Sequence, residues 1–151
     1  FQSGRKPLKM HSLKEIENSI DVNLRSPLYI IKALLDNNFK NFNIVLVGSE
    51  AAVYGGNNIS AYAITKSAMH SFPKSLSKEL GLQNIRINLI SPSIIETKKL
   101  LKNSKNLKDL KASTALGRIG KPQEVANLIE WLLSKKSSYI TGSVVPITGG
   151  R

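Results

Sequence analysis

The sequence predicts an α/β protein in which a small parallel sheet is covered by helices on both faces. Helical and strand-like segments alternate along the 151 residues, and this order favours parallel strands joined by right-handed helical crossovers. Three short apolar runs, rich in β-branched residues, have the length and composition of buried strands. They cover residues 43–48, 85–90 and 143–148.

The first helical segment begins at a capping box, in which Ser12 and Glu15 can each bond the other's backbone N–H. Apolar residues then recur at helical spacing as far as Leu35. Pro27 interrupts this run, because proline has no N–H and pushes away the carbonyl four residues back, which here belongs to Asn23. We therefore expect a helix with a kink near Asn23.

The later elements are also marked by capping residues and prolines. Ser60 is expected to cap a second helix, which would bend at Pro73 and end at Gly81. Pro122 suits the first position of a third helix. Pro146 cannot donate to a ladder, so the strand that contains it should lie at an edge of the sheet.

Composition excludes several classes of protein. The sequence has no cysteine, which removes a disulfide scaffold, a thiol nucleophile and a thiolate metal site. No apolar run reaches the roughly 18–20 residues of a bilayer span, and no signal-peptide pattern is visible, so we expect a cytoplasmic protein without a membrane segment. The net charge of +12 favours anionic partners, but with only 6% aromatic residues we do not expect nucleic acid among them.

Two residues of the expected second helix have the spacing of a catalytic pair. Tyr62 and Lys66 are four positions apart and so share one helix face. A Y-x-x-x-K pattern also occurs as an ordinary surface pair, and the surrounding sequence gives it weight here. Ser49 follows an expected parallel strand, at the edge where open α/β sheets build their sites.

With these residues, the sequence resembles the short-chain dehydrogenase/reductase family, and in particular its 3-oxoacyl-[acyl-carrier-protein] reductases. The resemblance covers nearly the whole chain after residue 6. Besides Ser49 and the Tyr62–Lys66 pair, it rests on the segments 21–24, 91–97, 116–126 and 140–150. Several matches in the right order are more specific than any one of them.

The resemblance implies a catalytic tetrad of Tyr62, Lys66, Ser49 and Asn23. Tyr62 would donate a proton to a carbonyl oxygen, and Ser49 would hydrogen-bond that oxygen. The carbonyl of Asn23 would anchor a water that links Lys66 to solvent. No metal site is implied.

The implied cofactor is NADP or NAD, with NADP slightly favoured. Its contacts would come from Tyr62, Lys66, Pro92, Ser93, Ile95 and Thr97. Ser93 stands where the family has a glycine, which puts the details of nicotinamide contact in doubt. Thr97 could instead cap the segment that follows it.

The resemblance also implies a Rossmann-like, doubly wound parallel sheet, of which this chain would form the C-terminal half. The glycine-rich turns that seat a dinucleotide's pyrophosphate, G-x-x-x-G-x-G and G-x-G-x-x-G, do not occur in the sequence. Residues 5–151 would then be the C-terminal part of a single oxidoreductase domain. Residues 1–4 resemble the remnant of a cleaved tag.

Three functions remain open on the sequence alone. The first is an NAD(P)-dependent oxidoreductase that acts on a small or carrier-linked carbonyl substrate, including 3-oxoacyl reduction in fatty acid biosynthesis, and forms a homo-oligomer (dimer or tetramer). The second is a catalytically incompetent fragment that only folds or oligomerises. The third is a basic binding module, supported by charge alone.

Two further features bear on these alternatives. Residues 98–111 contain six lysines and one aspartate, which predicts a solvated helix or, in the family, a basic lid over a substrate with phosphate or carboxylate groups. The two histidines, His11 and His70, match no metal-ligand or triad pattern and are interpreted as ordinary residues.

Overall fold

A three-stranded parallel sheet forms the centre of the molecule, as the computed structural model shows for residues 1–2, 4–103 and 106–151. The strand order is β1-β2-β3, which confirms the expected parallel α/β architecture. The strands are β1 (Asn43–Val47), β2 (Arg86–Pro92) and β3 (Val144–Ile147). β3 lies at one edge of this sheet, as Pro146 predicts.

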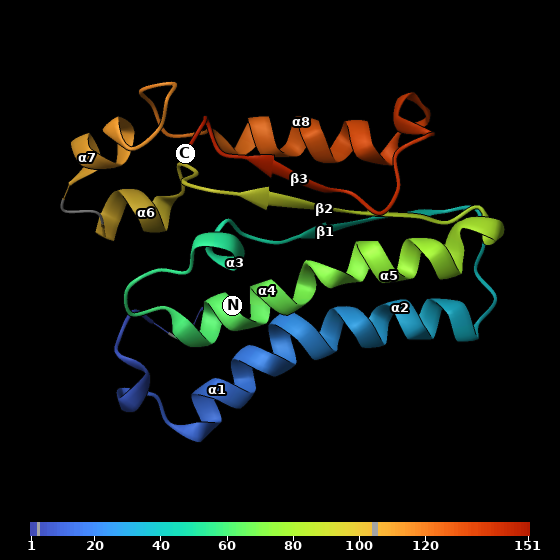
Figure 1. The fold of residues 1–151 in the computed structure, drawn as a ribbon, viewed down its shortest axis with the longest axis horizontal. Helices are drawn as coiled ribbons and strands as arrows, with labels where there is room; N and C mark the ends of the chain where they lie inside the picture. Colours follow the sequence, from blue (N-terminus) through green and yellow to red (C-terminus); the bar gives the residue numbers. More distant parts are fainter. Residues whose placement is uncertain (3, 104–105) are drawn as a thin grey trace.

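Helices cover both faces of the sheet (Figure 1). On one face, α8 packs against β1 and β2, and on the other α5 packs against β2, with α2 and α4 beside it. The α-helices are α1 (Leu13–Ile20), α2 (Ser26–Asp36), α3 (Ala51–Tyr54), α4 (Ser60–Met69), α5 (Ser71–Leu80), α6 (Lys98–Asn103), α7 (Leu107–Ala112) and α8 (Pro122–Leu133). Short 3-10 turns occupy Leu8–Met10, Gly81–Gln83 and Lys135–Ser137.

The kink expected near Asn23 takes the form of a π-helical turn. The capping box starts α1 as predicted: the Ser12 N–H donates to Glu15 Oε2 at 2.8 Å. Between α1 and α2, residues Asp21–Arg25 form a π-helix in which the Ser26 N–H donates to the carbonyl of Asp21, five residues back. A π-turn widens the helix, and such turns often mark functional sites.

The region around α4 differs from the expectation in three ways. Ser60 is the first residue of α4 and not its cap; Ile59 occupies the cap position without a side-chain bond. The single helix expected to run to Gly81 is divided between α4 and α5 at His70. The division has a local cause, since Pro73 has no N–H for the carbonyl four residues back. Finally, the short helix α3 lies between β1 and α4, where no helix was expected.

Two boundaries at the carboxyl side of the sheet also differ. β2 extends to Pro92, because its last residue pairs with Ile147 of β3. The Lys/Leu segment 98–111 forms two helices, α6 and α7, and not one. Lys105, one of the six lysines of that segment, and Ser3 of the suggested tag remnant lie outside the described residues.

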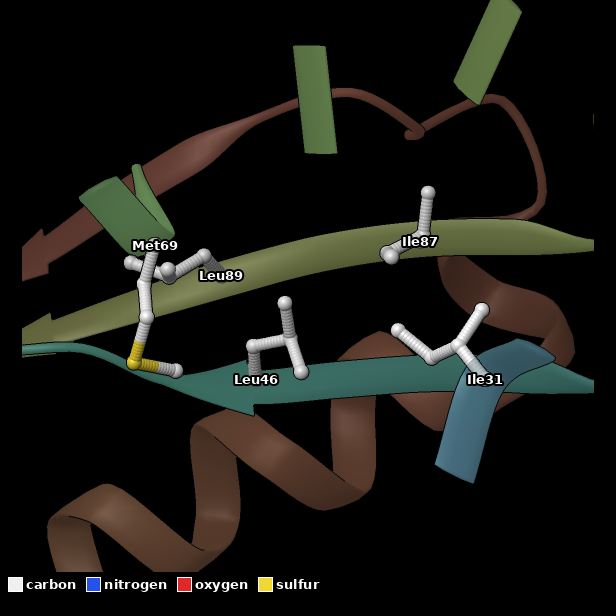
Figure 2. Packing of buried hydrophobic residues seen from close by; sticks show 5 residues of the cluster. All are labelled: Ile31, Leu46, Met69, Ile87 and Leu89. Atoms are coloured by element: carbon white, nitrogen blue, oxygen red, sulfur yellow. The ribbon is translucent and has the colours of Figure 1, made fainter. Parts of the chain in front are cut away.

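Five buried apolar side chains lock α2 and α4 onto β1 and β2, and Figure 2 shows them pointing toward one another. Ile87 and Leu89 of β2 are fully buried. Because they are two positions apart, both lie on one face of the strand. They pack with Leu46 of β1, Ile31 of α2 and Met69 of α4. This packing sets the carboxyl ends of β1 and β2 beside α4. Among the described helices, none is long and apolar enough to cross a membrane.

Candidate active site

Ser49 lies just beyond the carboxyl end of β1, at the edge of the sheet. The ladder with β2 continues past the last strand residue: the Gly48 N–H donates to the Ile90 carbonyl at 2.8 Å, and the Glu50 N–H donates to the Pro92 carbonyl at 3.1 Å. Ser49 Oγ accepts from the Ala51 N–H at 3.2 Å, at the start of α3. A hydroxyl that accepts one hydrogen bond can still donate another.

Ser49 opens onto a cavity of about 1250 Å³. The cavity brings together five of the residues predicted from the sequence: Ser49, Tyr62, Ser93, Ile95 and Thr97. They come from the end of β1, from α4 and from the loop after β2. Segments far apart in the sequence therefore meet at the carboxyl edge of the parallel sheet, where open α/β sheets bind ligands.

Backbone bonds fix the loop after β2 on two sides. The Ser93 N–H donates to the Ile147 carbonyl at 3.1 Å, and the Glu96 N–H donates to the Gly120 carbonyl at 2.7 Å. The Thr97 hydroxyl accepts from the Leu100 N–H at 3.1 Å at the start of α6, which is the capping role considered for it. Thr97 also lines the cavity, and its contact with a cofactor stays a prediction.

Lys66 lies behind Tyr62, one helical turn along α4. Its side chain is buried, and its ammonium donates to the Val47 carbonyl at 2.7 Å. The Nζ atom is 5.9 Å from the centre of the Tyr62 ring. Burial lowers the pKa of Lys66 below its usual value, because the charged form loses hydration. The ammonium is thus held in place beside the Tyr62 ring by the end of β1.

Asn23 and Pro92 lie close to this arrangement but do not line the cavity. Asn23 is buried in the π-turn, where its side-chain amide donates to Thr65 Oγ1 at 3.0 Å and also bonds the backbone of Phe1. Thr65 precedes Lys66, so Asn23 contacts the helix that carries the Tyr62–Lys66 pair. The water-anchoring role of its carbonyl stays a prediction. Pro92 ends β2 and contributes its carbonyl to the Glu50 N–H.

Several cavity residues were not foreseen from the sequence. Glu50 directly precedes the short helix α3 and Tyr54 ends it, whereas Arg5 and Arg151 come from opposite ends of the sequence. Arg151 Nη1 lies 3.4 Å from Ser93 Oγ. Glu50 could have been predicted as a cavity residue because it follows Ser49 directly. No local sequence pattern links Arg5 to Arg151. In the described ranges, no cluster of three or more His, Asp or Glu side chains is suited to a metal ion.

Comparison with known proteins agrees with this geometry. The family model described as enoyl-(acyl carrier protein) reductase matches residues 2–151. The chain belongs to the short-chain dehydrogenase/reductase family. Its similarity to curated members includes 37% identity over 134 residues to the 3-oxoacyl-[acyl-carrier-protein] reductase of Thermotoga maritima. The corresponding reductase of Chlamydia muridarum is 38% identical over 143 residues.

These matches cover 87% and 92% of this chain but 54% and 57% of the two reductases. The chain therefore spans about half the length of the curated short-chain reductases that it matches. Among solved structures, a short-chain dehydrogenase/reductase from Brucella melitensis superposes with a TM-score of 0.91 at 33% identity, over 99% of this chain and 61% of that one. A 4-hydroxyisoleucine dehydrogenase complexed with NADH gives 0.87 at 30% identity, over 97% and 64%.

Proposed function

We propose that this chain carries the catalytic half of an NAD(P)-dependent oxidoreductase that interconverts a carbonyl and a hydroxyl group. The observation that carries this proposal is the cavity at the carboxyl edge of the sheet. It holds Ser49 and Tyr62 on its wall, with the buried ammonium of Lys66 behind the tyrosine. An incompetent fragment or a basic binding module would not require these three groups to converge.

The side chains at the cavity fit the nicotinamide end of a dinucleotide. Ser93, Ile95 and Thr97 would hold that end beside Tyr62 and Lys66, and the pyrophosphate-binding turn is not part of this sequence. When bound, the cofactor supplies or accepts the hydride. The NADH complex of one structural neighbour supports the cofactor class. The resemblance to 3-oxoacyl reductases favours NADP over NAD, and titration with both cofactors decides between them.

Three groups of this chain would share the remaining chemistry. The Ser49 hydroxyl donates a hydrogen bond to the substrate oxygen and stabilises negative charge that develops there. The Tyr62 hydroxyl donates the proton that converts this oxygen to a hydroxyl. Lys66, anchored on the Val47 carbonyl, provides the positive charge that favours the phenolate left behind.

For the substrate, we propose a carrier-linked 3-oxoacyl group, as in fatty acid biosynthesis. The similarity to reductases of that name supports it. So does the cavity, because Leu100 of α6 and Leu110 of α7 add apolar surface on which an acyl chain could pack. The lysines on these two helices favour an anionic carrier. The cytoplasmic location expected from the sequence stays a prediction.

Substitution of Tyr62 by phenylalanine in the complete protein tests the proposed reaction. General acid catalysis is worth roughly 10²–10⁴-fold, so we expect Tyr62→Phe to lower kcat by at least about a hundredfold while the circular dichroism spectrum is retained. Tyr139→Phe is the matched control, because Tyr139 is fully exposed and lies outside the cavity. Wild-type turnover by Tyr62→Phe would rule the mechanism out.

We also propose that a second copy of the chain covers the outer face of α2 and α4. Tyr29 and Ile30 of α2 and Ile64 of α4 are each more than 60% exposed, although all three are large and apolar. Sedimentation of Ile64→Arg should show dissociation to a smaller species. Leu82→Arg, at a fully exposed residue of another surface, should sediment as wild type. Equal sedimentation of the Ile64 variant and wild type would contradict this interface.

A further inference from the structure

Three side chains in and directly after α4 form a row on one side of the helix, and two of them, Lys66 and His70, contact the end of β1. Tyr62, Lys66 and His70 follow one another at intervals of four, so they lie on one face of the helix. The first two belong to the proposed active site. His70 continues the row at the junction of α4 and α5, where Pro73 interrupts the helix.

The imidazole of His70 lies between the end of β1 and β2. Its Nε2 atom is 3.5 Å from the buried hydroxyl of Ser91. It also packs against the backbone of Gly48, since a Cβ atom at that position would lie only 3.2 Å from Nε2. The backbone of Ser49 adjoins the ring and favours its protonated form. The ring therefore lies against Gly48, the residue that links the end of β1 to Ser49.

Burial and the neighbouring charges have opposite effects on the pKa of His70. Burial lowers the pKa of the imidazole, Lys66 of α4 and Lys74 of α5 lower it further, and Glu50 at the start of α3 raises it. Burial is the largest of these effects, so the net shift favours the neutral form of the ring. A neutral imidazole offers one donor and one acceptor, which suits a position between a backbone segment and a serine hydroxyl.

Lys66 and His70 thus hold consecutive points of the same segment. Lys66 bonds the carbonyl of Val47 at 2.7 Å, and His70 packs on Gly48, the residue directly before Ser49. We propose that His70 is a positioning residue for Ser49: it holds the end of β1 against α4 and so fixes where the serine hydroxyl lies in the cavity. This inference rests on the proposed oxidoreductase function. It gives a role to a histidine that the sequence pattern left as ordinary.

A double-mutant cycle in the complete protein tests the proposal, because it asks whether His70 acts through Ser49. A displacement of about 1 Å at a reacting group can cost up to roughly a hundredfold in rate. We expect His70→Leu to lower kcat about tenfold with KM changed by less than about twofold. His70→Gln should recover most of the rate, because its amide can both donate and accept. In a Ser49→Ala background, His70→Leu should cost less than about twofold more.

Equal tenfold losses with and without Ser49 would overturn the proposal, as would a loss confined to KM. A second measurement does not depend on turnover: the backbone amide signals of Ser49 and Glu50 should shift in the NMR spectrum of His70→Leu and return toward wild type in His70→Gln. Lys78→Leu, at an exposed position of α5, is the control that should leave them in place.

Unchanged Ser49 signals in His70→Leu would refute the positioning role even if activity fell. If Tyr62→Phe kept full turnover while the Ser49 signals still moved, the proposed reaction would fail and the contact between His70 and Ser49 would stand. The two failures are therefore distinguishable.

Discussion

Gly48, beside the proposed active site, lies against both β2 and the side chain of His70. A Cβ atom at this position would lie 2.6 Å from Leu89 Cδ2, 3.2 Å from the Ile90 carbonyl oxygen and 3.2 Å from His70 Nε2. Carbon atoms in contact prefer about 3.5–4.0 Å. Leu89 is fully buried, and the Ile90 carbonyl is held by the Gly48 N–H. Gly48→Ala must therefore displace the end of β1 or its neighbours.

The cost follows from two opposing effects. Overpacking of a well-filled interior typically costs about 1–3 kcal/mol. Replacement of glycine by alanine also lowers the conformational entropy of the unfolded chain, which stabilises the fold by about 0.4–1 kcal/mol. We therefore expect Gly48→Ala to lower the free energy of unfolding by about 1–2 kcal/mol. Because Ser49 is the next residue, kcat should fall as well, by more than the fraction of protein that unfolds.

Urea unfolding followed by circular dichroism measures the first effect, and steady-state kinetics on the same samples measures the second. Gly81→Ala is the matched control. That glycine has helical dihedral angles (φ −57°, ψ −42°), and a Cβ there meets no atom within 4 Å, so the variant should be as stable as wild type or slightly more stable. Wild-type stability and turnover in Gly48→Ala would refute the close packing described above.

Two further predictions concern the frame around the site. Arg86→Met removes a guanidinium that donates to the carbonyls of Leu132, Ser134, Ser137 and Ile140. Hydrogen bonds to charged groups contribute roughly 1.5–3 kcal/mol each, and water replaces part of that set, so urea unfolding should show a loss of about 3 kcal/mol. A loss below about 1 kcal/mol would contradict this role. The second prediction is a pH dependence. Arg118 lowers the pKa of Glu124 from 4.5 to about 2, so this carboxylate stabilises the fold above pH 4.5, and the stabilisation is lost as pH falls from 4.5 to 2. Thermal unfolding midpoints should fall less steeply over that range in Glu124→Gln; parallel curves would show that the ion pair makes no contribution.

Local patterns predicted most of the elements. The capping box at Ser12, the apolar run at residues 43–48 and Pro122 each act within a few residues of the chain, and the structure confirms all three. Where a predicted helix differs from the structure, the cause is also local. Pro73 was expected to bend one helix, but the structure has two helices divided at His70, because Pro73 has no N–H for the carbonyl four residues back.

The candidate site was predicted where residues share one short segment. Tyr62 and Lys66 are four positions apart on one helix, and Ser93, Ile95 and Thr97 follow one strand, so sequence order alone places them together. Glu50, Arg5 and Arg151 were missed because they reach the cavity through the folding of separate segments. The same holds for His70, whose contacts with Gly48 and Ser91 join α4 to two strands.

The sequence by itself determined the parallel α/β class, the short-chain dehydrogenase/reductase family and the serine, tyrosine and lysine of the proposed reaction. The class depends on periodicity, and the family and the residue roles depend on motifs that resemble known members; both are properties of neighbours along the chain. Only the tertiary structure decided that the Lys66 ammonium is anchored on Val47, that a Cβ at Gly48 would clash with Leu89 and that His70 packs against Gly48. Such contacts join residues about 20 positions apart or more. They form only when buried side chains such as Leu46, Met69 and Leu89 pack α4 onto the sheet (Figure 2), and no local pattern encodes the resulting distances.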